Sequence, residues 1–67
     1  MDRQELMRDM KRTYDKSMIS TSQIRDFMGI SWERADAMMA GADFIPSGRA
    51  KMYFIGDVAD RIMKARG

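Results

Sequence analysis

Carboxylates are the side chains of this sequence that come closest to a catalytic pattern. Glu33 and Asp36 are three residues apart, which places both on one helical face, where two acids could serve as acid and base. An exposed acidic pair on a short helix is more often a solvated surface, and the sequence has no glycine-rich phosphate loop or metal-ligand cluster. Its 67 residues include no Cys and no His, which excludes disulfides, thiolate or imidazole zinc sites and Cys–His or Ser–His nucleophiles. We therefore expect a protein that is not an enzyme and that binds no metal or cofactor.

Three cations have the chemistry to contact a nucleic acid. The planar guanidinium of Arg34 matches the two acceptors of a guanine edge, although an ion pair with Glu33 or Asp36 is an equal alternative. Arg49 and Lys51 follow a turn-forming segment, where they could neutralise phosphates or remain solvated. The chain carries 12 basic and 10 acidic residues, a net charge of +2 that permits an anionic partner without demanding one.

The elements that would position Arg34 are two short helices within residues 20–40. Ser20 and Gln23 fit a capping box, which predicts the start of the first helix. Gly29 is expected to end that helix, and Ser31 is a cap for the next one. Two capped helices around a glycine predict a helix-turn-helix.

Such a unit presents the start of its second helix to the major groove of DNA. The expected base-contacting residues are Ser31, Trp32, Glu33, Arg34, Asp36 and Ala37. Trp32 could touch a thymine methyl or a sugar, or could pack as a partly buried staple on the following segment. Thr21 and Ser22 begin the first helix, whose free N–H groups can face a phosphate. Residues 20–42 hold two basic and three acidic side chains, so the acids would weaken binding unless they accept from cytosine amino groups.

Residues 43–56 predict a β-hairpin with its turn at Pro46-Ser47-Gly48. Ser47, Arg49 and Lys51 would then form a wing that follows the DNA backbone. Asp57 is expected to cap a last helix over residues 57–65.

An N-terminal helix is expected over residues 1–17. Leu6, Met10 and Tyr14 recur every four residues and form one apolar stripe. Residues 1–19 carry five basic and four acidic side chains, which favours an accessory docking or dimerisation helix over a basic arm on DNA.

From Met18 to Met63 the sequence resembles the winged helix-turn-helix of the MerR superfamily and of small excisionases and prophage regulators. The matching residues are Ile19-Ser20, Ile24, Phe27-Met28-Gly29-Ile30-Ser31, Lys51-Met52-Tyr53 and Asp57-Val58. The resemblance implies sequence-specific DNA binding, with bases contacted by the second helix and the backbone held by the wing. Arg25 departs from the pattern, which has a small residue there. No long coiled coil follows the winged unit, so no small-molecule effector is expected.

These observations predict one mainly α domain over residues 1–67 with a small β-hairpin, a winged helix-turn-helix with an extra N-terminal helix. The expected partner is double-stranded DNA, bound as an excisionase-like architectural factor or a small prophage or mobile-element regulator. An integrase or recombinase, or further copies on DNA, are additional candidate partners. With no apolar run long enough to span a bilayer, we expect a bacterial or phage protein of the cytoplasm. The alternative is a protein-interaction module that never touches DNA, favoured if Glu33, Asp36 and Asp43 dominate the face that should carry Arg34, Arg49 and Lys51.

Overall fold

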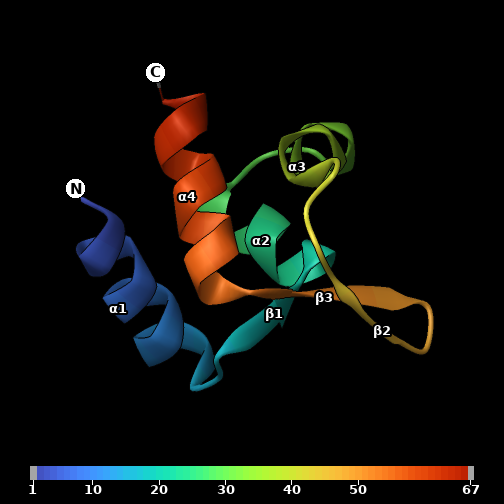
Figure 1. Ribbon diagram of the computed structural model, residues 1–67, viewed down its shortest axis with the longest axis horizontal. Helices are drawn as coiled ribbons and strands as arrows, with labels where there is room; N and C mark the ends of the chain where they lie inside the picture. Colours follow the sequence, from blue (N-terminus) through green and yellow to red (C-terminus); the bar gives the residue numbers. More distant parts are fainter. Residues whose placement is uncertain (1, 67) are drawn as a thin grey trace.

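The computed structural model describes residues 2–66, so Met1 and Gly67 of the predicted domain lie outside it. Its elements are α1 (Arg3–Tyr14), β1 (Met18–Ser20), α2 (Thr21–Met28), α3 (Trp32–Met39), β2 (Ile45–Ser47), β3 (Ala50–Phe54) and α4 (Ile55–Ala65). Figure 1 shows α1 and α4 at one side of the molecule and α3 with the β2–β3 hairpin at the other. The prediction of a mainly helical chain with a small antiparallel sheet is confirmed. None of the helices within residues 2–66 has the length and apolar character needed to cross a membrane.

The sheet has three antiparallel strands in the order β1-β3-β2, not the two of a hairpin. Residues 18 and 19 lie between the predicted N-terminal helix and the predicted helix pair, where no strand was expected. Ile19 pairs with Tyr53 of β3, and both side chains are buried. A three-residue strand is too short to show alternation, so its pairing with β3 could not be predicted locally.

The hairpin turn lies at Gly48 and Arg49, which corrects the prediction of a turn at residues 46–48. Pro46 lies inside β2, opposite Lys51. Proline is tolerated there because β2 is an edge strand and one side of it needs no ladder hydrogen bond. Within the turn only Gly48 has a positive φ, 61°, the pattern of a type II′ turn.

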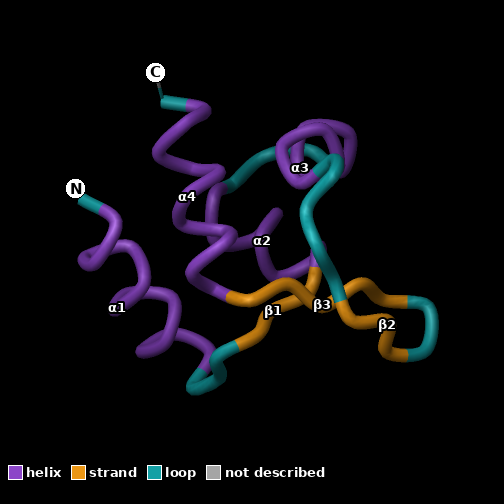
Figure 2. The backbone as a smooth tube through the Cα atoms, in the orientation of Figure 1, coloured by secondary structure: helices purple, strands orange, loops and turns teal. Residues whose placement is uncertain are grey.

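The last helix begins two residues before its predicted start. Phe54 is its N-cap residue and makes no side-chain cap bond, so the prediction that Asp57 is the cap is wrong. Asp57 lies in the first turn, where its charge complements the helix dipole. No loop separates β3 from α4 in Figure 2. A Cβ at Gly56 would lie 2.6 Å from the Phe54 ring, so a larger residue there would displace the half-exposed Phe54 side chain.

The N-terminal helix is part of the core rather than an accessory. It ends at Tyr14, because Asp15 adopts a left-handed conformation with φ 53°. Leu6 and Met10 are buried, and an ion pair joins Arg3 of α1 to Asp60 of α4. The prediction of a docking helix therefore holds, with α4 as the element it lies beside (Figure 1).

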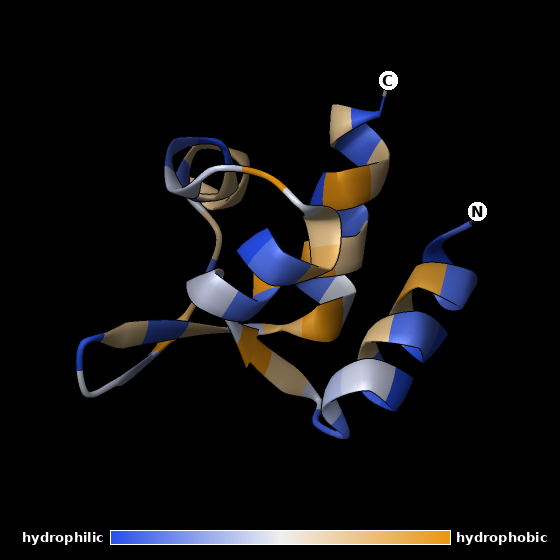
Figure 3. Cartoon of the chain, turned by 180° about the vertical axis from the view of Figure 1, so that it is seen from behind, coloured by the Kyte–Doolittle hydropathy of each residue, from blue (hydrophilic) through white to orange (hydrophobic). Residues whose placement is uncertain are grey.

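One hydrophobic core connects all the helices with the sheet. Its buried members are Leu6, Met10, Ile19, Ile24, Ala35, Met39, Tyr53, Ile55, Val58, Ala59 and Ile62. Figure 3 shows alternating hydrophobic and hydrophilic bands along α1 and α4, as expected for helices with one buried face.

Candidate nucleic-acid interface

A hollow of about 230 Å³ lies where the start of α2, the helix α3 and the β2–β3 turn meet. It is lined by Ser20, Thr21, Ser22, Trp32, Asp36, Arg49, Ala50 and Lys51. We call it the α3–hairpin groove. Six of its lining residues belong to the predicted DNA-contacting set, although they come from three separate parts of the sequence. The structure thus brings the second helix of the pair and the tip of the hairpin to one side of the molecule (Figure 1).

Helix α3 lies on the surface with its predicted contact residues outward. The Ser31 hydroxyl caps it by accepting a hydrogen bond from the backbone N–H of Arg34 at 3.2 Å. Ala35 and Met39 face the core. The six predicted base-contacting residues are all exposed, namely Ser31, Trp32, Glu33, Arg34, Asp36 and Ala37. Helix α3 therefore presents a mixed-charge face to solvent.

The start of α2 has the local structure that the sequence predicts. The predicted capping box is present, with the Gln23 N–H donating to the Ser20 hydroxyl at 3.2 Å and the Ser20 N–H donating to the Gln23 side chain at 2.9 Å. Ser22 is exposed, as a phosphate contact requires. Thr21 lines the α3–hairpin groove but is only 6% exposed, so Ser22 is the more accessible of the two residues.

Trp32 forms a contact that the sequence did not predict. Its side chain is 48% exposed, and the guanidinium carbon of Arg25 lies 5.3 Å from the ring centroid. Arg25 stands where the winged pattern has a small residue, and its guanidinium covers the indole. A cation over an indole face is attracted by the ring quadrupole. Two features of the sequence could have pointed to this contact: a long cationic side chain in α2 and an aromatic residue just after the Gly29 turn.

The hairpin supplies the groove's cations. Arg49 and Lys51 are both exposed, and the Lys51 ammonium lies 5.0 Å from the ring centroid of Phe44. Within residues 2–66 no hydrogen bond or ion pair occupies Arg49. Ser47 is exposed but lies outside the groove lining, at the other end of the turn opposite Ala50.

Of the three cations expected on one face, Arg49 and Lys51 lie together in the groove and Arg34 does not join them. Arg49 and Lys51 line the groove with Asp36, whereas Asp43 lines different hollows near α4. Arg34 and Glu33 lie on exposed α3 but are not among the lining residues. The groove therefore holds two cations and one carboxylate.

Arg61 of α4 is a positioning residue that sequence analysis missed. Its Nη1 donates to the Ala40 carbonyl at 2.8 Å and to the Met38 carbonyl at 3.2 Å. Carbonyls at the end of a helix have no partner within that helix. Arg61 therefore satisfies the C-terminal end of α3 and fixes it against α4.

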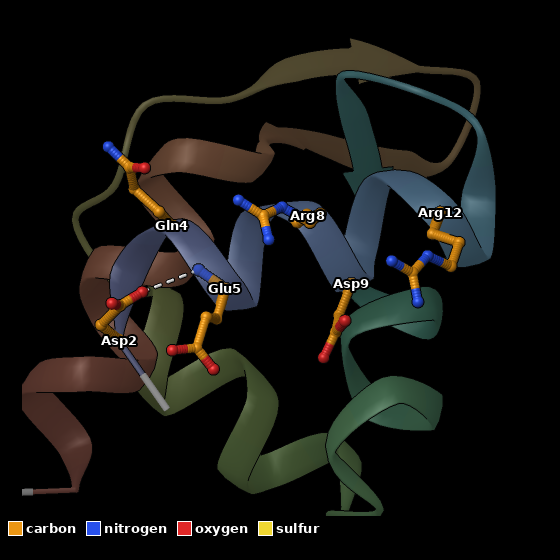
Figure 4. A pocket seen from close by; sticks show the side chains of 6 residues that line it. All are labelled: Asp2, Gln4, Glu5, Arg8, Asp9 and Arg12. Atoms are coloured by element: carbon orange, nitrogen blue, oxygen red, sulfur yellow. Dashed lines mark hydrogen bonds between the residues drawn. The ribbon is translucent and has the colours of Figure 1, made fainter.

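A second hollow, of about 380 Å³, lies along the outer side of α1 (Figure 4). Its lining residues are Asp2, Gln4, Glu5, Arg8, Asp9 and Arg12. Asp2 accepts a hydrogen bond from the Glu5 N–H and so caps α1. The remaining charges alternate in sign, which suits a solvated helix surface better than a ligand of one charge. Residues 2–66 also contain no cluster of acidic, His or Cys residues that could hold a metal ion.

Comparison of the chain with models of known protein families, with curated proteins and with solved structures gives no match. Function is therefore inferred from the groove and its surroundings.

Proposed function

We propose that this protein binds double-stranded DNA through a winged helix-turn-helix. In this proposal α2 and α3 form the helix-turn-helix, α3 enters the major groove, and the turn between β2 and β3 lies along the phosphate backbone. The observation that carries the proposal is the α3–hairpin groove, in which Trp32 and Asp36 of α3 face the same hollow as Arg49 and Lys51.

The dimensions of the surface suit a duplex. With its side chains an α-helix is about 10–12 Å across, which matches the roughly 12 Å width of the major groove, and α3 lies at the surface where it could enter that groove. Arg25 over the Trp32 ring and exposed Arg34 add positive charge at α3, while the exposed acids of α3 reduce non-specific attraction. A single copy would therefore neutralise only a few phosphates and bind with modest, salt-dependent affinity.

We further propose a role as an excisionase-like architectural factor or a small prophage-type regulator, working in the cytoplasm. This role rests on the resemblance to the winged units of the MerR superfamily and of small excisionases. An integrase or recombinase, or neighbouring copies on DNA, would then be the additional partners, because several weak contacts on one duplex raise the effective affinity.

The test removes the two hairpin cations, and a control variant loses the same number of positive charges from α1. Fluorescence anisotropy with a labelled random duplex compares the native chain, Arg49→Gln/Lys51→Gln and the α1 control Arg8→Gln/Arg12→Gln. We expect the hairpin variant to lose about 10- to 100-fold in affinity at about 50 mM salt, and its log–log salt slope to shrink by about 2. The control should retain the native slope. Absence of binding at low salt, or equal losses in both variants, would refute the proposal.

A second candidate function, protein interaction, rests on an apolar patch beside the sheet. Phe44, Ile45 and Phe54 are 45%, 57% and 46% exposed and, with Met18, surround a hollow of about 190 Å³. Exposed aromatic clusters of this kind mark interaction surfaces. Asp43 and Asp57 also line the hollow, so a fitting partner would present an apolar side chain beside a Lys or Arg. Failure of the anisotropy test would leave this patch as the better candidate site.

A further inference from the structure

Asp36 holds an unusual position on α3. It lies one turn after Trp32, and both side chains line the α3–hairpin groove opposite Arg49 and Lys51. Within the described part of the chain, no hydrogen bond or ion pair occupies its carboxylate. A carboxylate that faces two cations without pairing to them keeps its acceptor capacity for another donor.

The phosphate backbone cannot supply that donor. Phosphates are anionic and repel a carboxylate, so Asp36 would oppose DNA binding wherever it faced the backbone. On DNA it is favourable only against an amino group on a base edge. Those groups in the major groove are N4 of cytosine and N6 of adenine.

Cytosine is the better match of the two. A carboxylate only accepts hydrogen bonds, and the major-groove edge of cytosine offers a donor with no neighbouring acceptor of its own. Adenine places the acceptor N7 beside its N6 donor, which repels the second carboxylate oxygen. A carboxamide, with one donor and one acceptor, fits adenine instead.

We propose that Asp36 is a specificity-determining residue that selects cytosine at one position of the bound DNA. The inference rests on the proposed DNA-binding function and adds the base class that the groove accepts. Glu33 is a weaker candidate, since it lies outside the groove lining and in the first turn of α3, where its charge complements the helix dipole.

The experiment selects bound sequences from a randomised duplex library with the native chain, with Asp36→Asn and with Asp43→Asn. Asp43 is a matched control, because it is an exposed carboxylate that lines hollows away from the groove. We expect the native chain and the control to enrich one cytosine by about 5- to 150-fold over other bases. Asp36→Asn should lose that preference and enrich adenine at the same position. Equal unfolding midpoints of the three proteins in urea would show that the change is not a folding defect.

Two results would overturn the inference while leaving DNA binding intact. One is that the native chain binds duplex DNA in anisotropy but selects a consensus without a required cytosine, or enriches no sequence at all. The other is an Asp36→Asn consensus identical to that of the native chain. Absence of any duplex binding is a different result, because it removes the proposed function itself.

Discussion

Single residues set how the surface of α3 is presented. The guanidinium of Arg25 over the Trp32 ring joins α2 to the first residue of α3 across the Gly29 turn. Such a contact at a half-exposed site contributes about 0.5–1 kcal/mol. It also restricts the rotamers of an indole that lines the α3–hairpin groove. The ring is therefore held in place before any partner arrives, which lowers the entropy lost on binding.

Tyr14 gives a prediction that depends on pH. Its hydroxyl donates a hydrogen bond to the Gln23 carbonyl at 2.9 Å, and burial, with the nearby charge of Asp26, raises its pKa above 10.0. The folded chain therefore keeps this proton at a pH where the unfolded chain has lost it. The stability that the protonated Tyr14 hydroxyl contributes is complete below pH 10.0 and is lost as the pH rises through the raised pKa of Tyr14.

Tyr14→Phe removes both the hydrogen bond and this titration. At neutral pH the variant should unfold with a free energy about 0.5–1.5 kcal/mol lower than that of the native chain. The difference should shrink as the pH rises above 10.0, because only the native chain loses stability through Tyr14. Urea titrations across the alkaline range measure the gap, and a gap that stays constant with pH would contradict the role assigned to this hydroxyl.

Elements were predictable where their signals are local. The capping box of Ser20 and Gln23 correctly predicted the start of α2, and Ser31 correctly predicted the start of α3. Strand β1 was missed because Ile19 becomes a strand residue only by pairing with distant Tyr53. The start of α4 was misplaced for a related reason, since Tyr53 and Ile55 are both buried and lead the chain from sheet to helix without a side-chain cap.

The candidate site was likewise predictable only where the signals are local in the sequence. Arg49 and Lys51 were expected near α3 because a glycine-containing turn between β-type segments predicts a hairpin. The contacts that hold α3 in place, from Arg25 and Arg61, join residues from different helices. No periodicity in the sequence reports such pairs, because each cation alone resembles a solvated surface charge.

Arg61 supports a prediction at the scale of helix packing. Arg61→Met keeps most of the side chain's apolar stem and removes its hydrogen bonds to the end of α3. We expect the free energy of unfolding to fall by about 1.5–3 kcal/mol, the usual contribution of a hydrogen bond from a charged donor. Amide hydrogen exchange should accelerate in α3 more than in α1, because the lost bonds anchor α3 alone.

Lys64→Met, at an exposed position of α4, is the matched control, and it should leave exchange in α3 unchanged. Uniform acceleration across all helices in Arg61→Met would show a general loss of stability and would contradict a specific anchor. DNA affinity then serves as a second readout, because a loosened α3 should bind more weakly even under conditions where the variant is fully folded.

At the scale of the whole molecule, α1 and the α3–hairpin groove lie at opposite sides of one small core (Figure 1). The core includes Leu6 and Met10 of α1 together with Ile62 of α4. A chain of 67 residues buries only about 60% of the surface that its unfolded form exposes, so it has little stability in reserve. The helix farthest from the groove should therefore govern whether the groove exists.

Met10→Ala tests this dependence. Met10 has no exposed surface, and truncating a buried Met costs about 2–5 kcal/mol, a large part of the stability of a small domain. We expect the urea midpoint to fall sharply and DNA binding to fall in proportion to the folded fraction. Met63→Ala, the same change at a side chain that is 38% exposed, should shift the midpoint little. If α1 did not contribute to the core, the urea midpoint and the DNA binding of Met10→Ala would stay near those of Met63→Ala. The comparison therefore decides whether the helices and the sheet unfold as one cooperative unit.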